Sequence, residues 1–286
     1  MNGQAERVFE LQRLEKRLAG QNLPRHSKIF AFTSGKGGTG KTFLSVNMAF
    51  ALSIMGKKIL LVDFDCNFSN VHILMNVIAT KTLSLFFLNK NLLPELITEV
   101  EPNLSVIFGD SGMQDFPKLS AGSIVNFFGQ LRNLEHEYDF IFIDTASGTN
   151  KETLEILSQS DHTIVITSPE PTAVMDAYVV IKLLDGVGFT GEKNIVVNKS
   201  EDKNLADLTF LNLKTAVDHF LKTEIKFLGF AGNDAAVSRS IMAQTLLMKQ
   251  TSNLPSEAGS LITLQISELA ANLIKYIHVA NIKQAG

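Results

Sequence analysis

The stretch Gly35-Lys36-Gly37-Gly38-Thr39-Gly40-Lys41-Thr42 decides the fold of this chain. It matches the pattern G-x-x-x-x-G-K-[ST], in which a glycine-rich loop wraps its backbone N–H groups around a phosphate. The apolar run Ile29–Thr33 precedes the loop, and a helical pattern begins near Thr42, as such a loop requires. Lys41 is therefore predicted to reach the β- and γ-phosphates of a nucleotide such as ATP, and the Thr42 hydroxyl to ligate Mg²⁺.

Short apolar runs alternate with helical patterns along the rest of the chain. Most of these runs are apolar on both faces, which is typical of strands buried on both sides in a parallel sheet. The helical stretches between them, including residues 200–222, supply the crossovers that parallel strands need. The runs are Ile29–Thr33, Ile59–Phe64, Leu104–Phe108, Phe140–Asp144, Thr163–Thr167, Ile195–Asn198 and Ile225–Phe230. We predict an α/β fold over residues 28–286, with a doubly wound, mostly parallel sheet.

Composition restricts the classes of function. The 286 residues suit one large α/β domain, and a net charge of −3 argues against non-specific DNA binding by the whole surface. A single cysteine, Cys66, excludes an internal disulfide framework. No stretch has the pattern of a signal peptide or the length and apolarity of a membrane span. We therefore expect a cytoplasmic protein.

Residues 1–27 are predicted to form a separate helical extension. Apolar side chains recur there at helical spacing, which predicts a short amphipathic helix over residues 4–19. These side chains are Val8, Leu11, Leu14 and Leu18. Basic residues outnumber acidic ones in the extension: Arg7, Arg13, Lys16, Arg17 and Arg25 against Glu6, Glu10 and Glu15. Packing on the domain, fraying, and binding to a partner all remain open for this helix.

Acidic residues close two of the predicted strands. Asp63 and Asp65 follow a buried run, and alternation along the strand points both side chains to the same side. One of them can hold a water of the Mg²⁺ shell while the other orients the attacking water. Asp144 ends a second apolar strand, which is the usual place for a carboxylate near Mg²⁺, and Gly148 lets the backbone approach the γ-phosphate.

The loop with its flanking serine, Ser34 to Thr42, resembles the deviant Walker A motif of the MinD/ParA family of P-loop ATPases. The resemblance covers roughly residues 28–277. It implies that Lys36 reaches across a dimer interface to the nucleotide of the partner. The family's Asp-x-Asp and Asn-x-Asp pair resembles Asp63, Asp65 and Asn70. By that match Asp65 positions the attacking water and Asp63 lies near the metal.

The resemblance also covers the second switch and the segment that contacts the adenine base. Residues 144–148 are similar to the family's Asp-Thr/Ser-x-x-Gly switch, and Val197-Asn198-Lys199 resembles the segment whose asparagine reads adenine. An amide can donate and accept at once, which suits a base edge, although a turn asparagine is the alternative. The nucleotide-binding residues implied for ATP or ADP are Gly35, Lys36, Gly37, Gly38, Thr39, Gly40, Lys41, Thr42, Phe43, Asp144, Gly148, Pro169, Asn198 and Lys199, and those near Mg²⁺ are Thr42, Asp63 and Asp144. The catalytic residues are Asp65, Lys36 and Lys41.

The segment from Pro169 to Tyr178 is more similar to the FlhG (FleN, YlxH) branch than to MinD or ParA proper. FlhG proteins set the number and placement of bacterial flagella. The resemblance implies an ATP-dependent homodimer whose partners are flagellar regulators: an FlhF-type GTPase, a flagellar transcription activator or components of the flagellar switch. Gln4-Ala5 matches only part of the Asp-Gln-Ala motif by which FlhG contacts FlhF.

Several positions depart from the family pattern. Asn67 stands where glycine is usual, His72 where aspartate is usual, and Phe43 where a small or polar residue is usual. The phosphate chemistry survives these changes, whereas the first switch is altered. Two alternatives to a flagellar regulator that hydrolyses ATP therefore stay open. One is a MinD/ParA-type positioning or DNA-partition ATPase, although we predict no DNA partner. The other is an adaptor that holds a nucleotide without hydrolysing it.

A late apolar stripe bears on membrane association. It comprises Ile262, Ile266, Leu269, Leu273 and Ile277. We interpret it as the last helix of the domain packed on the sheet. The alternative is an amphipathic helix at the inner face of the cell membrane, but that role needs a larger apolar face and more cations.

Overall fold

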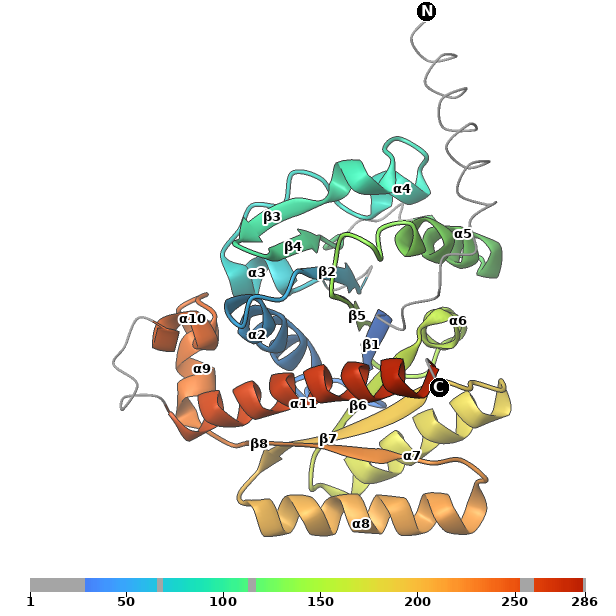
Figure 1. Ribbon diagram of the computed structural model, residues 1–286, viewed down its shortest axis with the longest axis vertical. Coiled ribbons are helices and arrows are strands. Elements are labelled where there is room, and N and C mark those ends of the chain that lie inside the picture. The colour runs from blue at the N-terminus through green and yellow to red at the C-terminus, as the bar shows by residue number, and fades with distance from the viewer. Residues whose placement is uncertain (1–28, 66–68, 113–116, 253–259, 285–286) are drawn as a thin grey trace, which may run out of the picture.

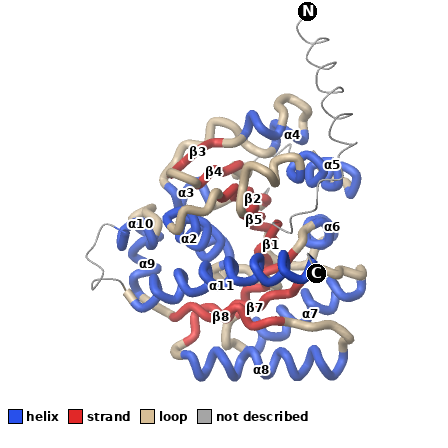
Figure 2. The backbone as a smooth tube through the Cα atoms, in the orientation of Figure 1, coloured by secondary structure: helices blue, strands red, loops and turns tan. Residues whose placement is uncertain are grey.

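The computed structural model describes residues 29–65, 69–112, 117–252 and 260–284. The extension 1–27, with its predicted helix over residues 4–19, lies outside the described residues, as do Cys66 and Asn67. One sheet runs through the described part in the order β3-β4-β2-β5-β1-β6-β7-β8 (Figures 1 and 2). Its strands are β1 (Ile29–Thr33), β2 (Ile59–Phe64), β3 (Thr98–Glu101), β4 (Leu104–Ile107), β5 (Phe140–Thr145), β6 (His162–Thr167), β7 (Glu192–Ser200) and β8 (Lys226–Gly232).

The seven predicted strands are present, all paired in parallel, which confirms a mostly parallel sheet. β3 was not predicted. It pairs antiparallel with β4 at the edge of the sheet, with Thr98 opposite Val106. Its sequence TEVE is short and largely polar, and its residues are half-buried or exposed. The search for runs that are apolar on both faces therefore could not find it.

Helices cover both faces of the sheet. They are α2 (Lys41–Ile54), α3 (Val71–Met75), α4 (Ser84–Phe87), α5 (Ala121–Arg132), α6 (Lys151–Gln159), α7 (Pro171–Gly186), α8 (Lys203–Phe220), α9 (Ala235–Met242), α10 (Leu247–Ser252) and α11 (Leu261–Gln284), with a 3-10 turn at Leu93–Leu96. Alternation along the strands divides the core in two: Phe30 and Phe32 pack with α2 and α11, whereas Ile29 and Ala31 pack with α5, α6, α7 and α8. The doubly wound fold is thereby confirmed.

Helix α11 lies against β8 and α2. Ile262, Ile266, Leu269 and Leu273 are buried in the core shared with α2, so the interpretation of this stripe as part of the domain is confirmed for these four residues. The side chain of Ile277 lies outside the described part. None of the helices within the described ranges is both long and apolar enough to cross a membrane.

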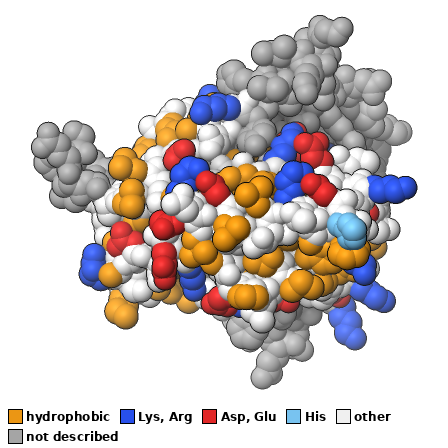
Figure 3. Space-filling view, turned by 90° about the horizontal axis from the view of Figure 1, so that it is seen from below, with side chains coloured by type: hydrophobic (Ala, Val, Ile, Leu, Met, Phe, Trp, Pro, Cys, Tyr) orange, Lys and Arg blue, Asp and Glu red, His pale blue; other side chains and the backbone are white. Residues whose placement is uncertain are grey.

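The lower face of the molecule, where α8 lies, mixes hydrophobic and charged side chains (Figure 3). On α8 itself, Leu208 and Leu211 are exposed. The ion pairs Lys203–Asp207 and Lys214–Asp218, each spanning four residues, stand on the same helix. Such exposed pairs contribute little to stability, so the amphipathic packing of α8 on the sheet is what holds it in place.

Candidate functional site

The phosphate loop joins the carboxyl end of β1 to the first turn of α2. Gly40 precedes the helix with φ +89°, a left-handed conformation that glycine adopts without strain. Gly35 is required for a different reason, because a Cβ added there would come within 2.5 Å of the backbone of Asp176 on α7. Strand, loop and helix thus confirm the predicted local structure, and the backbone N–H groups at the start of α2 can face an anion.

Lys41 is buried at the base of the loop. Its Nζ donates to Asp144 Oδ1 at 2.9 Å and to Thr42 Oγ1 at 3.3 Å. The Lys41 and Asp144 side chains are 5% and 1% exposed, so this ion pair is nearly free of solvent screening. The second oxygen of Asp144, Oδ2, is buried and has no hydrogen-bond partner among the described residues. An ammonium group and an unsatisfied carboxylate oxygen therefore lie next to the loop that a phosphate would occupy.

Asp63 lies beside Asp144, because β2 and β5 pair with these two residues in register. Its carboxylate accepts hydrogen bonds from Ser69 Oγ at 2.6 Å and from the backbone N–H groups of Asp65 and Val71, both at 3.2 Å. Burial and the neighbouring Asp144 carboxylate raise the pKa of Asp63 to about 7, and the three hydrogen bonds counteract part of that rise. Asp63 thus ties the end of β2 to the start of α3.

The donors present at this edge of the sheet fit Mg²⁺. Two carboxylates at neighbouring strand ends repel each other, and the buried Asp144 Oδ2 can accept a cation. The Thr42 hydroxyl lies next to Lys41 in the same loop. Within the described ranges, no three His, Cys, Asp or Glu side chains converge on one point. Mg²⁺ needs no such cage, since it commonly takes one or two carboxylates together with phosphate oxygens and water.

The raised pKa of Asp63 predicts a dependence of stability on pH. The pKa of Asp63 is about 7 in the folded protein and 3.8 for an ordinary aspartate, so the folded state binds the proton more tightly. This contribution to stability is therefore present at low pH and lost as pH rises through 7. Between pH 8 and pH 5, without nucleotide and in EDTA, we expect the free energy of unfolding to rise by about 3 kcal/mol relative to Asp63→Asn. Urea unfolding of both proteins at four pH values measures the difference, and parallel pH profiles would contradict it.

Lys36 lies at the surface of the loop, in contrast to Lys41. Its ammonium group pairs with Glu170 Oε2 and donates to Thr172 Oγ1 at 3.2 Å, and the side chain is 32% exposed. Lys36 lowers the pKa of the Glu170 carboxyl through this hydrogen bond and its charge. The role of Glu170 was not predicted from the sequence. Its only signal was its place between two prolines at the start of α7, within the motif already noted.

Residues after β7 close over the other side of the loop. Asn198 Nδ2 donates to the Thr39 carbonyl at 2.7 Å, and Lys199 Nζ donates to the Gly38 carbonyl at 2.8 Å. The hydroxyl of Thr39 is buried and has no hydrogen-bond partner within the described ranges. The asparagine predicted to read a base thus contacts the loop itself in this structure. The predicted role at adenine stays a prediction.

The remaining residues that were predicted to bind nucleotide lie around the same edge of the sheet. The backbone N–H of Gly148 donates to the Ser34 carbonyl at 2.9 Å, which links the second switch to the phosphate loop. Pro169 lies between β6 and α7, next to Glu170. Phe43 is only 7% exposed and packs in the core with its side chain, so its backbone is what faces the loop. Phe43 therefore departs from the family pattern without placing a bulky ring at the phosphates.

The segment around Asp65 and His72, which corresponds to the first switch of the family, contains a contact that was not predicted from the sequence. Asp65, half-buried, follows the end of β2. His72 Nδ1 lies 3.3 Å from Ser69 Oγ, the same hydroxyl that donates to Asp63. From the sequence, His72 was noted only because it stands where aspartate is usual in the family. The sequence carried no signal for Ser69, because a serine in a loop has no distinctive spacing.

The doubly wound sheet and the phosphate loop at its edge define the MinD-like fold of P-loop NTPases. The chain belongs to the AAA domain family (AAA_31), whose profile matches residues 27–197. It is 29% identical to the flagellum site-determining protein YlxH of Helicobacter pylori, over 88% of this chain and 86% of that protein. It is 27% identical to the antiactivator FleN of Pseudomonas aeruginosa, over 76% and 78%. The resemblance to the FlhG branch is thus confirmed.

Solved structures establish the fold independently. The septum site-determining protein MinD of Pyrococcus horikoshii, solved with Mg-ADP, superposes with a TM-score of 0.73 at 21% identity, covering 88% of this chain and 98% of that one. The MinD protein of Aquifex aeolicus in complex with MinC gives a TM-score of 0.69 at 20% identity, covering 87% and 96%.

Proposed function

We propose that this protein is an ATP-driven dimerisation switch. The observation that carries the proposal is the different surroundings of Lys36 and Lys41, the two lysines of the phosphate loop. Lys41 lies buried on Asp144, where it can hold the β- and γ-phosphates, whereas Lys36 is 32% exposed and pairs with Glu170. In this proposal the exposed Lys36 reaches the nucleotide of a second chain. An isologous dimer would supply two such lysines, one to each site.

Each residue has a defined task in this proposal. The loop N–H groups and Lys41 bind and orient the phosphates, and Thr42 and Asp144 would hold Mg²⁺, which supplies charge neutralisation at the transferring phosphoryl group. Asp65 orients the attacking water. Lys36 leaves Glu170 and enters the partner's site, where it stabilises negative charge developing on the γ-phosphoryl oxygens. Hydrolysis then removes the group that holds the two chains together.

We further propose that the switch acts on flagellar number or placement. The support is the similarity to YlxH of Helicobacter pylori and FleN of Pseudomonas aeruginosa over most of the chain. In this proposal the ATP-bound dimer binds flagellar regulators, of which an FlhF-type GTPase and a flagellar transcription activator are the candidates, and the ADP-bound monomer releases them. Association with the inner face of the cell membrane would be peripheral.

A mixing experiment tests the crossing lysine. Lys36→Ala and Asp65→Ala should each hydrolyse ATP poorly on their own. In a mixed dimer, the Lys36→Ala subunit keeps Asp65 and receives Lys36 from its partner, so one of its two sites is complete. An equimolar mixture should recover activity that neither variant has alone, up to about half of the wild-type rate, since one of the two sites in each mixed dimer is complete. A mixture no more active than its components would contradict the proposal.

A further inference from the structure

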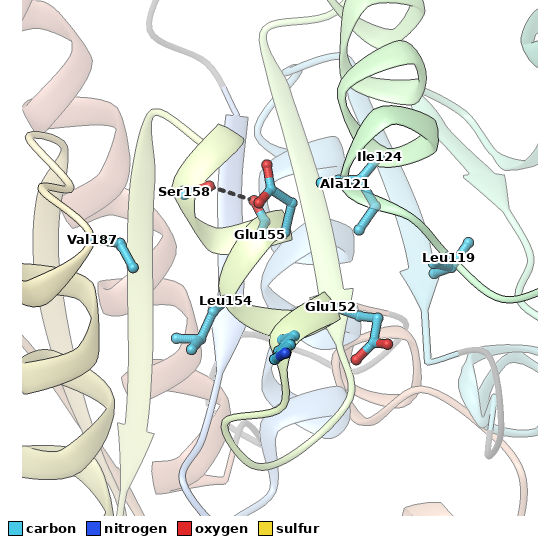
Figure 4. A pocket seen from close by; sticks show the side chains of 9 residues that line it. Leu119, Ala121, Ile124, Glu152, Leu154, Glu155, Ser158 and Val187 are labelled. Atoms are coloured by element: carbon cyan, nitrogen blue, oxygen red, sulfur yellow. Dashed lines mark hydrogen bonds between the residues drawn. The ribbon is translucent and has the colours of Figure 1, made fainter.

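A hollow on the outer surface of α6 is not used by the nucleotide site. Its volume is about 550 Å³, and it lies between the start of α5 and the end of α7. Leu119, Ala121 and Ile124 line the α5 side, whereas Leu154 lies on the side of α6 that faces Val187 (Figure 4). Val187 is 54% exposed, so its apolar side chain is accessible at the edge of the hollow. An apolar strip is therefore open to a binding partner.

The start of the described chain lies next to this hollow. A second hollow, lined by Arg132, Asp161 and residues 187–191, shares Ser158 and Val187 with the first, so the two are continuous. Asp161 fixes the start of β1 there, because its Oδ2 accepts from Ile29 N and its backbone N–H donates to the Ile29 carbonyl, both at 3.0 Å. Ile29, the first described residue, thus lies at the mouth of this groove.

The segment that precedes Ile29 has the matching chemistry. Its apolar positions Val8, Leu11, Leu14 and Leu18 share one face at helical spacing. A helix over residues 4–19 would be about 24 Å long, and the residues from Leu18 to Ile29 can span more than about 30 Å, so the segment can reach any part of the groove.

Charge supports the same pairing. Glu152, Glu155 and Lys151 of α6 line the first hollow, and Arg132 and Asp161 line the second, so the groove has three acidic side chains against two basic ones. The half of the segment closest to Ile29 is basic, with Arg13, Lys16 and Arg17 against Glu15. A basic helix with an apolar stripe is complementary to an apolar groove with an acidic rim.

We propose that residues 4–19 bind as an amphipathic helix in the groove over α6 of their own chain. Leu11, Leu14 and Leu18 face Leu154, Val187 and Ile124, and the net positive charge of the helix then lies near Glu152 and Glu155. The interaction is independent of ATP hydrolysis. A partner protein that binds the same apolar stripe must first displace the helix from α6. The binding of the helix to the groove therefore lowers the apparent affinity for such a partner.

Hydrogen exchange on the full-length protein tests the proposal. Backbone amides in residues 8–18 should exchange at least about tenfold more slowly than in an unstructured peptide. Val187→Asp should remove most of this protection, as should Glu152→Lys, a second exposed position that tests the charge. Val179→Asp is the matched control, because Val179 is 40% exposed on α7 and does not line the groove. Unprotected amides in the wild type, or equal protection in all variants, would overturn the proposal.

Photo-crosslinking identifies the occupant directly. Leu14 is replaced by benzoylphenylalanine, the full-length protein is irradiated, and the products are mapped by mass spectrometry. The expected product is a crosslink to Leu154 or Val187 that migrates as a monomer. Crosslinks that join two chains would show a second copy in the groove, and crosslinks elsewhere on the domain would show a different docking face. Either result contradicts the proposal.

Discussion

Lys41→Ala should abolish ATP binding at any concentration used for the wild-type protein. Lys41 is the ammonium group at the base of the loop, and no other lysine there is buried against a carboxylate. Loss of its charge-assisted hydrogen bonds to phosphate should cost about 3 kcal/mol or more, which is about a hundredfold in affinity. Isothermal titration with Mg-ATP measures the change. An affinity within threefold of the wild type would show that the phosphates bind elsewhere.

The same substitution has a second effect that must be separated from the first. It leaves Asp144 buried without its ion-pair partner, which should reduce the stability of the nucleotide-free protein by about 3–5 kcal/mol. The double variant Lys41→Ala/Asp144→Asn removes the uncompensated charge, so it should recover most of the stability and none of the binding. Lys214→Ala on α8 removes an exposed ion pair and should change neither property, because such pairs contribute less than about 1 kcal/mol.

Asp65→Ala should leave ATP binding intact and slow its hydrolysis by about a hundredfold or more, the usual contribution of a group that orients and deprotonates an attacking water. Asp65 lies just beyond the strand end that carries Asp63, so it can reach the nucleotide without contributing to the phosphate loop. Binding and single-turnover hydrolysis are measured on the same preparation. Any dimer formed with ATP should persist, since the step that releases it is blocked.

Asp207→Ala is the matched control for Asp65→Ala. Asp207 is an aspartate on α8 that pairs with Lys203 at the surface, and its loss should change neither binding nor turnover. If Asp65→Ala hydrolyses ATP at the wild-type rate, another group positions the water. The neighbouring Ser69–His72 contact would then be the first place to look.

The central part of the fold could be predicted because its signals are local. Buried parallel strands are apolar on both faces, and the loop between Thr33 and Lys41 has glycines that the backbone conformation demands. β3 could not be predicted in this way, since this edge strand is short, largely polar and only partly buried. Its pairing with β4 is decided by tertiary contacts rather than by its own pattern.

The same distinction applies to the site. Lys41, Asp63 and Asp144 were predictable because strand ends at one edge of a parallel sheet converge. The contacts of Lys36 with Glu170, and of Asn198 with the Thr39 carbonyl, join residues more than a hundred positions apart. No local spacing encodes such contacts. The resemblance to a family likewise implied a role across the dimer for Lys36 and a role at adenine for Asn198, but not the partners of these two residues within one chain.

Solution mass by light scattering tests the central claim most directly. The protein is measured at one concentration with Mg-ADP and then with Mg-ATP, using the wild type and Asp65→Ala to prevent turnover. An ATP-driven switch predicts the mass of one chain with Mg-ADP and of two chains with Mg-ATP, and Lys36→Ala should remain a monomer in both. The same mass with both nucleotides would contradict the switch and leave a nucleotide-bound adaptor in which Lys36 stays paired with Glu170.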